Sequence, residues 1–182
     1  MPKLEHTSVP LWATASPTVA PEPDCGGASY LLVGVGAQGR EQVATWADAL
    51  SGHPVARVVG DHADYVGVDL AAALAEAQVG VRVRIAGPVS SCLALRGVAV
   101  NAGVEDDELH VAATAKGTID VWCSHCTSTS AVEAEIDDVV RCRGCGRSLL
   151  VYHHVSRRTG RFLGFQIDAE ALPDGLSAEV AS

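Results

Sequence analysis

Two Cys-x-x-Cys pairs, Cys123-Ser-His-Cys126 and Cys142-Arg-Gly-Cys145, are separated by fifteen residues. Each pair can direct two thiolates at one ion, and four thiolates complete the tetrahedral coordination that Zn²⁺ prefers. Because four sulfur ligands leave no open position for water or substrate, we expect a structural zinc site and expect His125 to be a surface residue. Four unbound thiols are disfavoured, since so small a module would otherwise lack enough core to stay folded.

The residues around the two pairs are typical of a zinc ribbon. Residues 132–137 alternate apolar and acidic side chains, the period expected of a strand with one solvated face. Runs at residues 119–122 and 148–152 supply neighbouring strands, and Gly144 and Gly146 give the backbone freedom at the second pair. The Cys-x-x-Cys-Gly sequence also resembles a rubredoxin knuckle, so a tetrathiolate iron that carries an electron is the alternative to zinc.

A hairpin and a basic block follow the ribbon. We expect the hairpin turn at residues 157–160, between strands at 153–155 and 162–167. Six arginines and no acid fall between residues 141 and 161, namely Arg141, Arg143, Arg147, Arg157, Arg158 and Arg161. A nucleic-acid module would carry such a block. Lysine is absent from it, however, and the carboxylates of the acidic strand could pair with the arginines. Arginine together with Phe162 and Phe165 equally suits a protein interface.

Upstream, residues 30–113 alternate short apolar runs with helical spacing. The run at residues 30–34 suits a strand buried on both faces, the runs at 55–59 and 81–86 suit two further strands, and residues 109–113 suit a last edge strand. Alternation of this kind predicts a mostly parallel sheet with right-handed crossovers. The expected fold class is therefore α/β, with a small, mostly parallel sheet and flanking helices, followed by an all-β zinc ribbon with a hairpin.

A glycine motif, Gly34-Val-Gly36-Ala-Gln-Gly39, lies between the first strand and the first helix. This is the place of the G-x-G-x-x-G fingerprint of dinucleotide-binding folds, and Asp61 follows the second strand where a ribose-binding acid would lie. Backbone amides at the glycines would then face a pyrophosphate at a helix N-terminus. The alternative is that the glycines only form a tight strand-to-helix turn.

The segment Val83-Arg-Ile-Ala-Gly87-Pro88-Val-Ser-Ser-Cys92-Leu-Ala-Leu-Arg96 resembles the Gly-Pro segment that closes the NAD(P)-binding half of ferredoxin-reductase-type oxidoreductases. The resemblance adds Gly87 and Pro88 to the candidate nucleotide contacts. The family's flavin-binding motif and its Gly-Gly-x-Gly-x-x-Pro turn are absent, which favours a shortened, degenerate nucleotide fold over a working reductase. Cys92 is expected to be a small buried hydrophobe and not a nucleophile.

A second resemblance is more specific and covers roughly residues 119–170. The two Cys-x-x-Cys pairs and the segment Tyr152-His-His-Val-Ser-Arg-Arg-Thr-Gly160-Arg-Phe-Leu-Gly-Phe-Gln-Ile-Asp-Ala-Glu170 resemble the small, DmmA-like subunit of dimethylamine monooxygenase. This implies a multisubunit enzyme that uses NADPH and O₂ to convert dimethylamine to methylamine and formaldehyde. It also implies haem on one partner subunit and flavin plus an iron–sulfur centre on another. Only the four cysteines carry over as site residues.

Length and composition bound the remaining classes. At 182 residues and 18.8 kDa the chain fits one domain with a small module attached, and its 48% hydrophobic content excludes wholesale disorder. No run approaches the ~20 apolar residues of a membrane span, and no signal peptide is visible, so we expect a cytoplasmic protein without a membrane partner. In that reducing compartment cysteines serve metals more often than disulfides. A net charge of −9 argues against general nucleic-acid binding.

We therefore expect a flexible proline-rich arm at residues 1–29, an α/β domain at 30–113, a zinc ribbon and hairpin at 114–172, and a tail at 173–182. The predicted role is a zinc-binding accessory subunit, without catalytic residues of its own, that docks onto a haem-containing catalytic subunit and a flavin and iron–sulfur reductase. The alternatives are a nucleic-acid-binding zinc ribbon, a nucleotide-binding oxidoreductase and a rubredoxin-like electron carrier.

Overall fold

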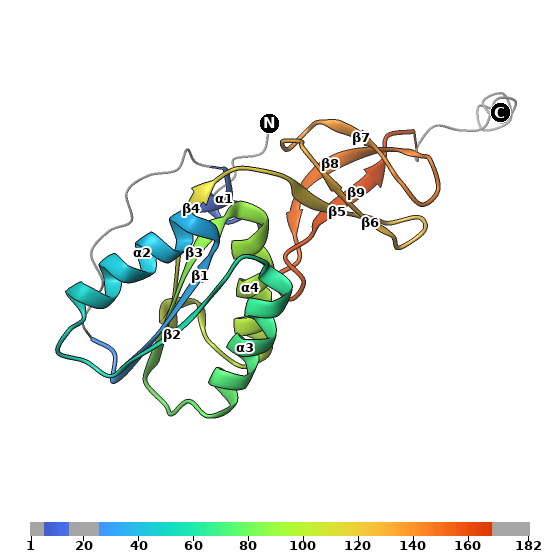
Figure 1. Cartoon of the computed structure of the whole chain (residues 1–182). Coiled ribbons are helices and arrows are strands. Elements are labelled where there is room, and N and C mark those ends of the chain that lie inside the picture. The colour runs from blue at the N-terminus through green and yellow to red at the C-terminus, as the bar shows by residue number, and fades with distance from the viewer. Residues whose placement is uncertain (1–5, 15–25, 169–182) are drawn as a thin grey trace, which may run out of the picture.

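Two sheets lie side by side in the computed structural model, which describes residues 6–14 and 26–168 (Figure 1). The first sheet carries helices on both faces, and the second is the cysteine-containing ribbon. This arrangement confirms the expected fold class. In the described part of the chain, no helix is long and apolar enough to cross a membrane. The expected division into four segments stays a prediction, and residues 169–182, which include the expected tail at 173–182, lie outside the described residues.

The first sheet is parallel and has the strand order β2-β1-β3-β4. Its strands are β1 (Ser29–Val35), β2 (Val55–Gly60), β3 (Val81–Pro88) and β4 (Leu109–Ala115). The helices between them are α2 (Gly36–Ala49), α3 (Ala63–Ala75) and α4 (Val89–Asn101), with the short 3-10 helix η2 (Asp106–Glu108) before β4. The strand-helix alternation and the edge position of β4 agree with the sequence prediction.

Both faces of this sheet are covered, because neighbouring residues of β1 point to opposite sides. Leu32 packs with Trp46 of α2 on one face. Val33 packs with Leu70 of α3 and Leu95 of α4 on the other. Figure 1 shows the sheet between α2 on one side and α3 and α4 on the other. Two separate apolar clusters thus hold the α/β region together.

The second sheet is mixed and has the order β6-β5-β9-β8-β7. Its strands are β5 (Ile119–Cys123), β6 (Thr129–Val132), β7 (Val139–Arg141), β8 (Ser148–Val155) and β9 (Phe162–Gln166). The first cysteine pair lies at the turn between β5 and β6, and the second lies at the turn between β7 and β8. The parallel pairing of β5 with β9 joins these two antiparallel units.

The strand predicted over residues 132–137 is wrong. β6 ends at Val132, and the chain then turns, with the Glu135 N–H donating to the Asp138 carboxylate at 2.8 Å and Asp137 at a φ of +72°. Ala134 and Ile136 nevertheless pack against the ribbon core. The alternation in the sequence therefore reports which side chains are buried and not whether the backbone pairs.

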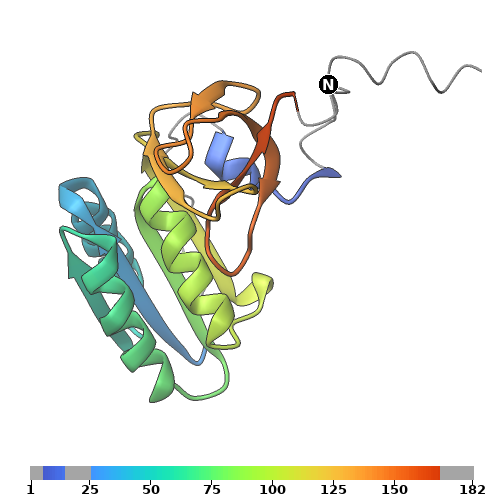
Figure 2. The same cartoon turned by 90° about the vertical axis from the view of Figure 1, so that its right-hand side faces the viewer.

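The predicted hairpin between β8 and β9 is present, and its turn packs on α4. Gly160 has a φ of +69°, and its N–H donates to the Ser156 carbonyl at 2.9 Å. A Cβ on Gly160 would lie 2.4 Å from the carbonyl carbon of Leu93, and a Cβ on Gly97 would lie 2.6 Å from the Arg158 carbonyl oxygen. Figure 2 shows this loop beside α4. Two glycines thus let the hairpin and the helix approach backbone to backbone.

The described part of the N-terminal segment packs against the ribbon. Val9 is 4% exposed and belongs to the ribbon cluster, and the Ser8 hydroxyl accepts the Val155 N–H at 2.8 Å. Trp12, on the short helix α1 (Leu11–Thr14), packs against both the ribbon cluster and the cluster beside α3 and α4. Residues 1–5 and 15–25, including Cys25, lie outside the described residues, and the flexibility expected of the arm stays a prediction.

Candidate metal centre

The four cysteine sulfurs of the two pairs come together in one cluster. The Sγ atoms of Cys123, Cys126, Cys142 and Cys145 all lie within 4.8 Å of one another. Cys126 and Cys142 are separated by 3.6 Å between sulfurs, and Cys123 and Cys145 by 3.8 Å. These separations are far longer than the ~2 Å of a disulfide. A tetrahedron with Zn–S bonds of about 2.3 Å has edges of about 3.8 Å, so the sulfurs are spaced to hold one ion.

Both cysteine turns have the same backbone pattern. In the first, Thr127 N–H donates to the Cys123 carbonyl and Cys123 N–H donates to the Ser128 carbonyl, each at 2.9 Å. In the second, Gly146 N–H donates to the Cys142 carbonyl at 2.9 Å. Thr127 and Gly146 hold equivalent positions and both have positive φ, +61° and +73°. The repeated turn directs two sulfurs from each side toward one point.

Polar contacts around the sulfurs favour a thiolate at Cys126. The Ser128 hydroxyl lies 2.8 Å from Cys126 Sγ, and this hydrogen bond is the largest of several contacts that together lower the pKa of the Cys126 thiol to about 6. In the second turn, the Gly144 N–H donates to Cys142 Sγ at 3.4 Å. A Cβ on Gly144 would lie 2.0 Å from the Ser128 hydroxyl oxygen, so only glycine fits beside this serine. Ser128 was not singled out from the sequence, where its position two residues after Cys126 was the only signal.

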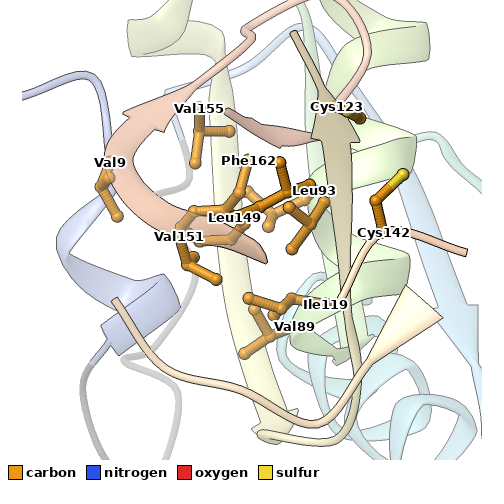
Figure 3. Close-up of a cluster of buried hydrophobic side chains, with 11 residues drawn as sticks. Val9, Val89, Leu93, Ile119, Cys123, Cys142, Leu149, Val151, Val155 and Phe162 are labelled. Carbon is orange, nitrogen blue, oxygen red and sulfur yellow. The ribbon is translucent and has the colours of Figure 1, made fainter. Parts of the chain in front are cut away.

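The cluster is part of the ribbon core. Cys123 and Cys142 are buried, and they belong to the same apolar cluster as Leu149 and Phe162 (Figure 3). Cys126 and Cys145 are only half-buried and lie at its edge. An ion held by the four sulfurs would therefore join the β5–β6 turn to the β7–β8 turn. It would also close the end of the ribbon core at which these two turns meet.

The five candidate nucleotide residues lie at the carboxyl ends of the adjacent strands β1 and β3 and in the first turn of α2, which follows β1. They are Gly34, Gly36, Gly39, Gly87 and Pro88. A Cβ on Gly39 would lie 2.6 Å from the Ala86 carbonyl oxygen, and a Cβ on Gly34 would lie 2.8 Å from the Gly39 carbonyl oxygen. Close packing of α2 on the sheet accounts for these two glycines. Gly36 opens the helix with a φ of +73°, and a Cβ added there would meet no atom within 4 Å.

Asp61, the candidate ribose-binding acid, forms an ion pair with Arg40 of α2 at 2.7 Å. Cys92 is fully buried, and burial raises the pKa of its thiol to about 12, which agrees with the expected role as a small hydrophobe. His125 is exposed, as expected.

The basic block divides between two places. Arg157, in the hairpin turn, pairs with Asp106 at 2.9 Å, whereas Arg141 and Arg143 are exposed at the second cysteine turn. Among the ion pairs of residues 6–14 and 26–168, Glu135 pairs with Lys116 at 2.6 Å, and none joins the arginine block to the acidic segment at 133–137. The pairing considered from the sequence is therefore not formed.

Phe162 is not an interface anchor. It is 2% exposed and lies in the ribbon core, because the inward alternation of β9 places it beside Val121 and Leu149. Phe165, three residues later, is 39% exposed and faces outward. Only one of the two phenylalanines considered from the sequence is thus available to a partner.

Among the comparisons with known proteins, the match of the ribbon to a family model is the most specific. Residues 120–165 match the family model described as dimethylamine monooxygenase subunit DmmA-like, C-terminal domain. The chain is also 32% identical over 101 residues to the heme-dependent oxidative N-demethylase delta subunit of Ectopseudomonas mendocina (strain ymp). That alignment covers 56% of this chain and 57% of the relative, so the chain spans little more than half of the relative's length. No solved structure matches the chain. The resemblance expected from the sequence is confirmed, and the chain is similar to a DmmA-like accessory subunit.

Proposed function

We propose that this chain is a zinc-binding accessory subunit of a multisubunit oxidative N-demethylase, and specifically of an NADPH- and O₂-dependent dimethylamine monooxygenase. The match of residues 120–165 to the DmmA-like C-terminal domain carries the proposal. The clustering of the four cysteines supports it, because the matched residues include both cysteine pairs. The similarity to a demethylase delta subunit supports membership of a heteromeric oxidoreductase.

Within that assembly the chain has a structural role. Its four-cysteine cluster leaves a bound ion no open coordination position, so the ion would not meet substrate. Activation of O₂ needs a redox cofactor, which protein side chains alone do not replace. Haem on a catalytic subunit, and flavin with an iron–sulfur centre on a reductase subunit, would supply the chemistry. This chain would hold those subunits together in the cytoplasm.

Zinc is proposed over iron because the ion's function here is to close the ribbon core. Elemental analysis of the purified chain tests this choice, with one zinc per chain expected. A red protein with the absorption of a tetrathiolate iron would instead support a rubredoxin-like electron carrier.

Reconstitution tests the function. The chain is co-expressed with the haem and reductase subunits of its own source, and formaldehyde formation from dimethylamine is measured with NADPH and O₂. We expect activity with the wild-type chain and its loss with Cys142→Ser, because the ribbon would lose its ion. Cys92→Ala is the matched control, since Cys92 lies outside the cysteine cluster and should leave metal content and activity in place. Equal activity without this chain would contradict the proposal.

NADPH is proposed as a ligand of the edge formed by the carboxyl ends of β1 and β3, at Gly34, Gly36, Gly39, Gly87 and Pro88. There the N-terminal amides of α2 would face a pyrophosphate. Calorimetric titration of the purified chain with NADPH tests this part separately. If the purified chain does not bind NADPH, this ligand is removed from the proposal, and the proposed docking role is unaffected.

A further inference from the structure

The ribbon sheet has one buried face and one face turned away from the core. Strand alternation places Val139 and Arg141 of β7, Leu150 and Tyr152 of β8, and Phe165 on this outer side, and Ile167 follows β9 in the same alternation. We call these six residues the outer ribbon face. Their sequence neighbours Val140, Leu149 and Val151 point the other way, into the core.

Strand register makes the apolar part of this face continuous. Val139 lies directly across from Leu150, and Leu150 lies directly across from Phe165, so three apolar side chains form one row over three strands. Ile167 continues along β9 and is tied to β8 by its N–H, which donates to the Ser148 carbonyl at 3.2 Å. Directly opposed side chains on one face are in contact range.

Four of the large side chains of the outer ribbon face are exposed to solvent. Val139 and Ile167 are each 55% exposed, and Phe165 and Tyr152 are each 39% exposed. Isolated exposed apolar residues are ordinary, whereas a contiguous apolar group with polar surroundings marks an interaction site.

Arginines border the apolar row. Arg141 lies in β7 next to it, across from Ser148, and its guanidinium reaches over the second cysteine turn, with Nη2 3.7 Å from the position of a Gly146 Cβ. Arg143 is exposed on the same turn, and the Arg147 guanidinium donates to the Gln166 side chain at the end of β9. This local positive charge contrasts with the net charge of −9 for the whole chain.

We propose that the outer ribbon face is the surface by which this chain docks onto a partner protein, and that the partner offers an apolar surface bordered by carboxylates. The inference rests on the proposed function and names the surface that performs it. Aromatic and arginine side chains with no lysine are the composition of the energetically dominant part of protein interfaces. Charge complementarity selects an acidic partner, since Arg141 and Arg143 beside the apolar row are exposed to solvent.

The partner is a different protein and not a second copy. In a symmetric pair of copies, the outer ribbon face would meet the same face of the other copy, and arginines would lie against arginines. Such a pair would not supply the carboxylates that the arginine-bordered face requires. Nucleic acid fits less well, because an apolar row occupies the centre of the face and phosphate contacts need cations there.

The test compares two face variants with two matched variants on the far side of the molecule. Phe165→Asp and Arg141→Glu alter the outer ribbon face, whereas Tyr65→Asp and Arg57→Glu make the same chemical changes at exposed positions of α3 and β2. Binding of each purified chain to the co-purified haem and reductase subunits is measured by biolayer interferometry. Metal content and far-ultraviolet circular dichroism verify that each variant is folded.

We expect Phe165→Asp to weaken binding by about 30-fold or more and Arg141→Glu by about 10-fold, with both far-side variants within about threefold of wild type. Tight binding of wild type with no loss in either folded face variant would overturn this inference while the proposed function stands. Absence of binding by wild type would overturn both.

Two further measurements separate the other occupants. A concentration-dependent dimer of the wild-type chain that Phe165→Asp abolishes would show that a second copy covers the face. Salt-sensitive binding of a fluorescent 20-nucleotide single strand or duplex, lost in Arg141→Glu, would show that the face binds nucleic acid. Either result would overturn the assignment to an acidic protein partner, and we expect a monomer with no nucleic-acid binding.

Discussion

The sheets of the α/β region and of the ribbon are buried in different ways. In the α/β region, helices cover both faces of β1 and β3, and two apolar clusters result. The ribbon buries one face only, and its cluster includes Cys123 and Cys142, two of the four clustered cysteines. That cluster also includes Val89 and Leu93 of α4 and Val9 of the N-terminal segment. A small sheet without its own helices is thus completed by neighbouring parts of the chain and, in the proposed site, by an ion held between the cysteines.

The comparison predicts that removing the metal affects the two regions very differently. A strong chelator should abolish amide hydrogen-exchange protection in β5, β7 and β8, because structural zinc contributes on the order of 10 kcal/mol to folding of such modules. Protection in β1 and β3 should persist, since their apolar clusters do not include the cysteine ligands. Exchange measured by mass spectrometry checks this. Equal protection of the ribbon with and without metal would show that the ribbon core is sufficient alone.

A glycine substitution tests the contact between the two regions, because the hairpin turn of the ribbon packs on α4. Gly160→Ala should cost about 3 kcal/mol or more, since its Cβ would lie 2.4 Å from the Leu93 carbonyl carbon in a chain with a φ of +69°. Gly117→Ala is the matched control, with a φ of +70° and no atom near the added Cβ, and should cost only about 1 kcal/mol. Urea unfolding of both variants measures the difference. Equal losses would mean that backbone strain, and not contact with α4, determines the effect.

The N-terminal segment provides a smaller test of the same dependence. Ser8→Ala removes the hydroxyl that accepts the Val155 N–H, and we expect a loss of about 1 kcal/mol, detected as faster exchange at the end of β8. Thr45→Ala removes a hydroxyl that donates only to Glu41 within the exposed face of α2. That control should change stability by less than about 0.5 kcal/mol. A Ser8 variant indistinguishable from it would separate the segment from the ribbon core.

The equivalent positions of the two cysteine turns give small expected effects of opposite sign. Thr127→Gly should stabilise the ribbon by about 0.5–1 kcal/mol, because a β-branched residue there has a φ of +61°. Gly146→Ala, at the same place in the second turn, should destabilise it by about 1 kcal/mol. Denaturant midpoints of the zinc-bound proteins check both signs. A destabilised Thr127→Gly would show that the threonine side chain contributes more than its backbone strain costs.

Features of both regions could be predicted where the sequence signal is local. Short apolar runs followed by helical spacing located β1, β2, β3 and the edge strand β4, because each signal is local and the crossover rule arranges the strands. The cysteine spacing likewise predicted that the four sulfurs lie together, since each pair is a local signal and a four-thiolate site requires both pairs. In both cases, residues close together in the sequence determine the structural feature that was predicted.

The predictions from the sequence were wrong where contacts between segments far apart in the chain determine the structure. The alternation at residues 132–137 is real, but β6 ends at Val132 and the chain turns before Asp137 and Asp138 form backbone hydrogen bonds with Val151 of β8. The apolar side chains of this turn still face the core. Phe162 was expected at the surface, yet the parallel pairing of β5 with β9 places it inside. That pairing joins segments about 40 residues apart, and no local signal encodes it. The packing of Gly160 against α4 and of Val9 against the ribbon is similarly invisible until the chain is folded.

X-ray absorption spectroscopy at the zinc edge of the purified chain shows whether the four cysteines hold one ion that completes the ribbon. We predict a single shell of four sulfur neighbours at about 2.3 Å. A shell dominated by oxygen or nitrogen, or a chain that is fully folded without stoichiometric metal, would contradict the account.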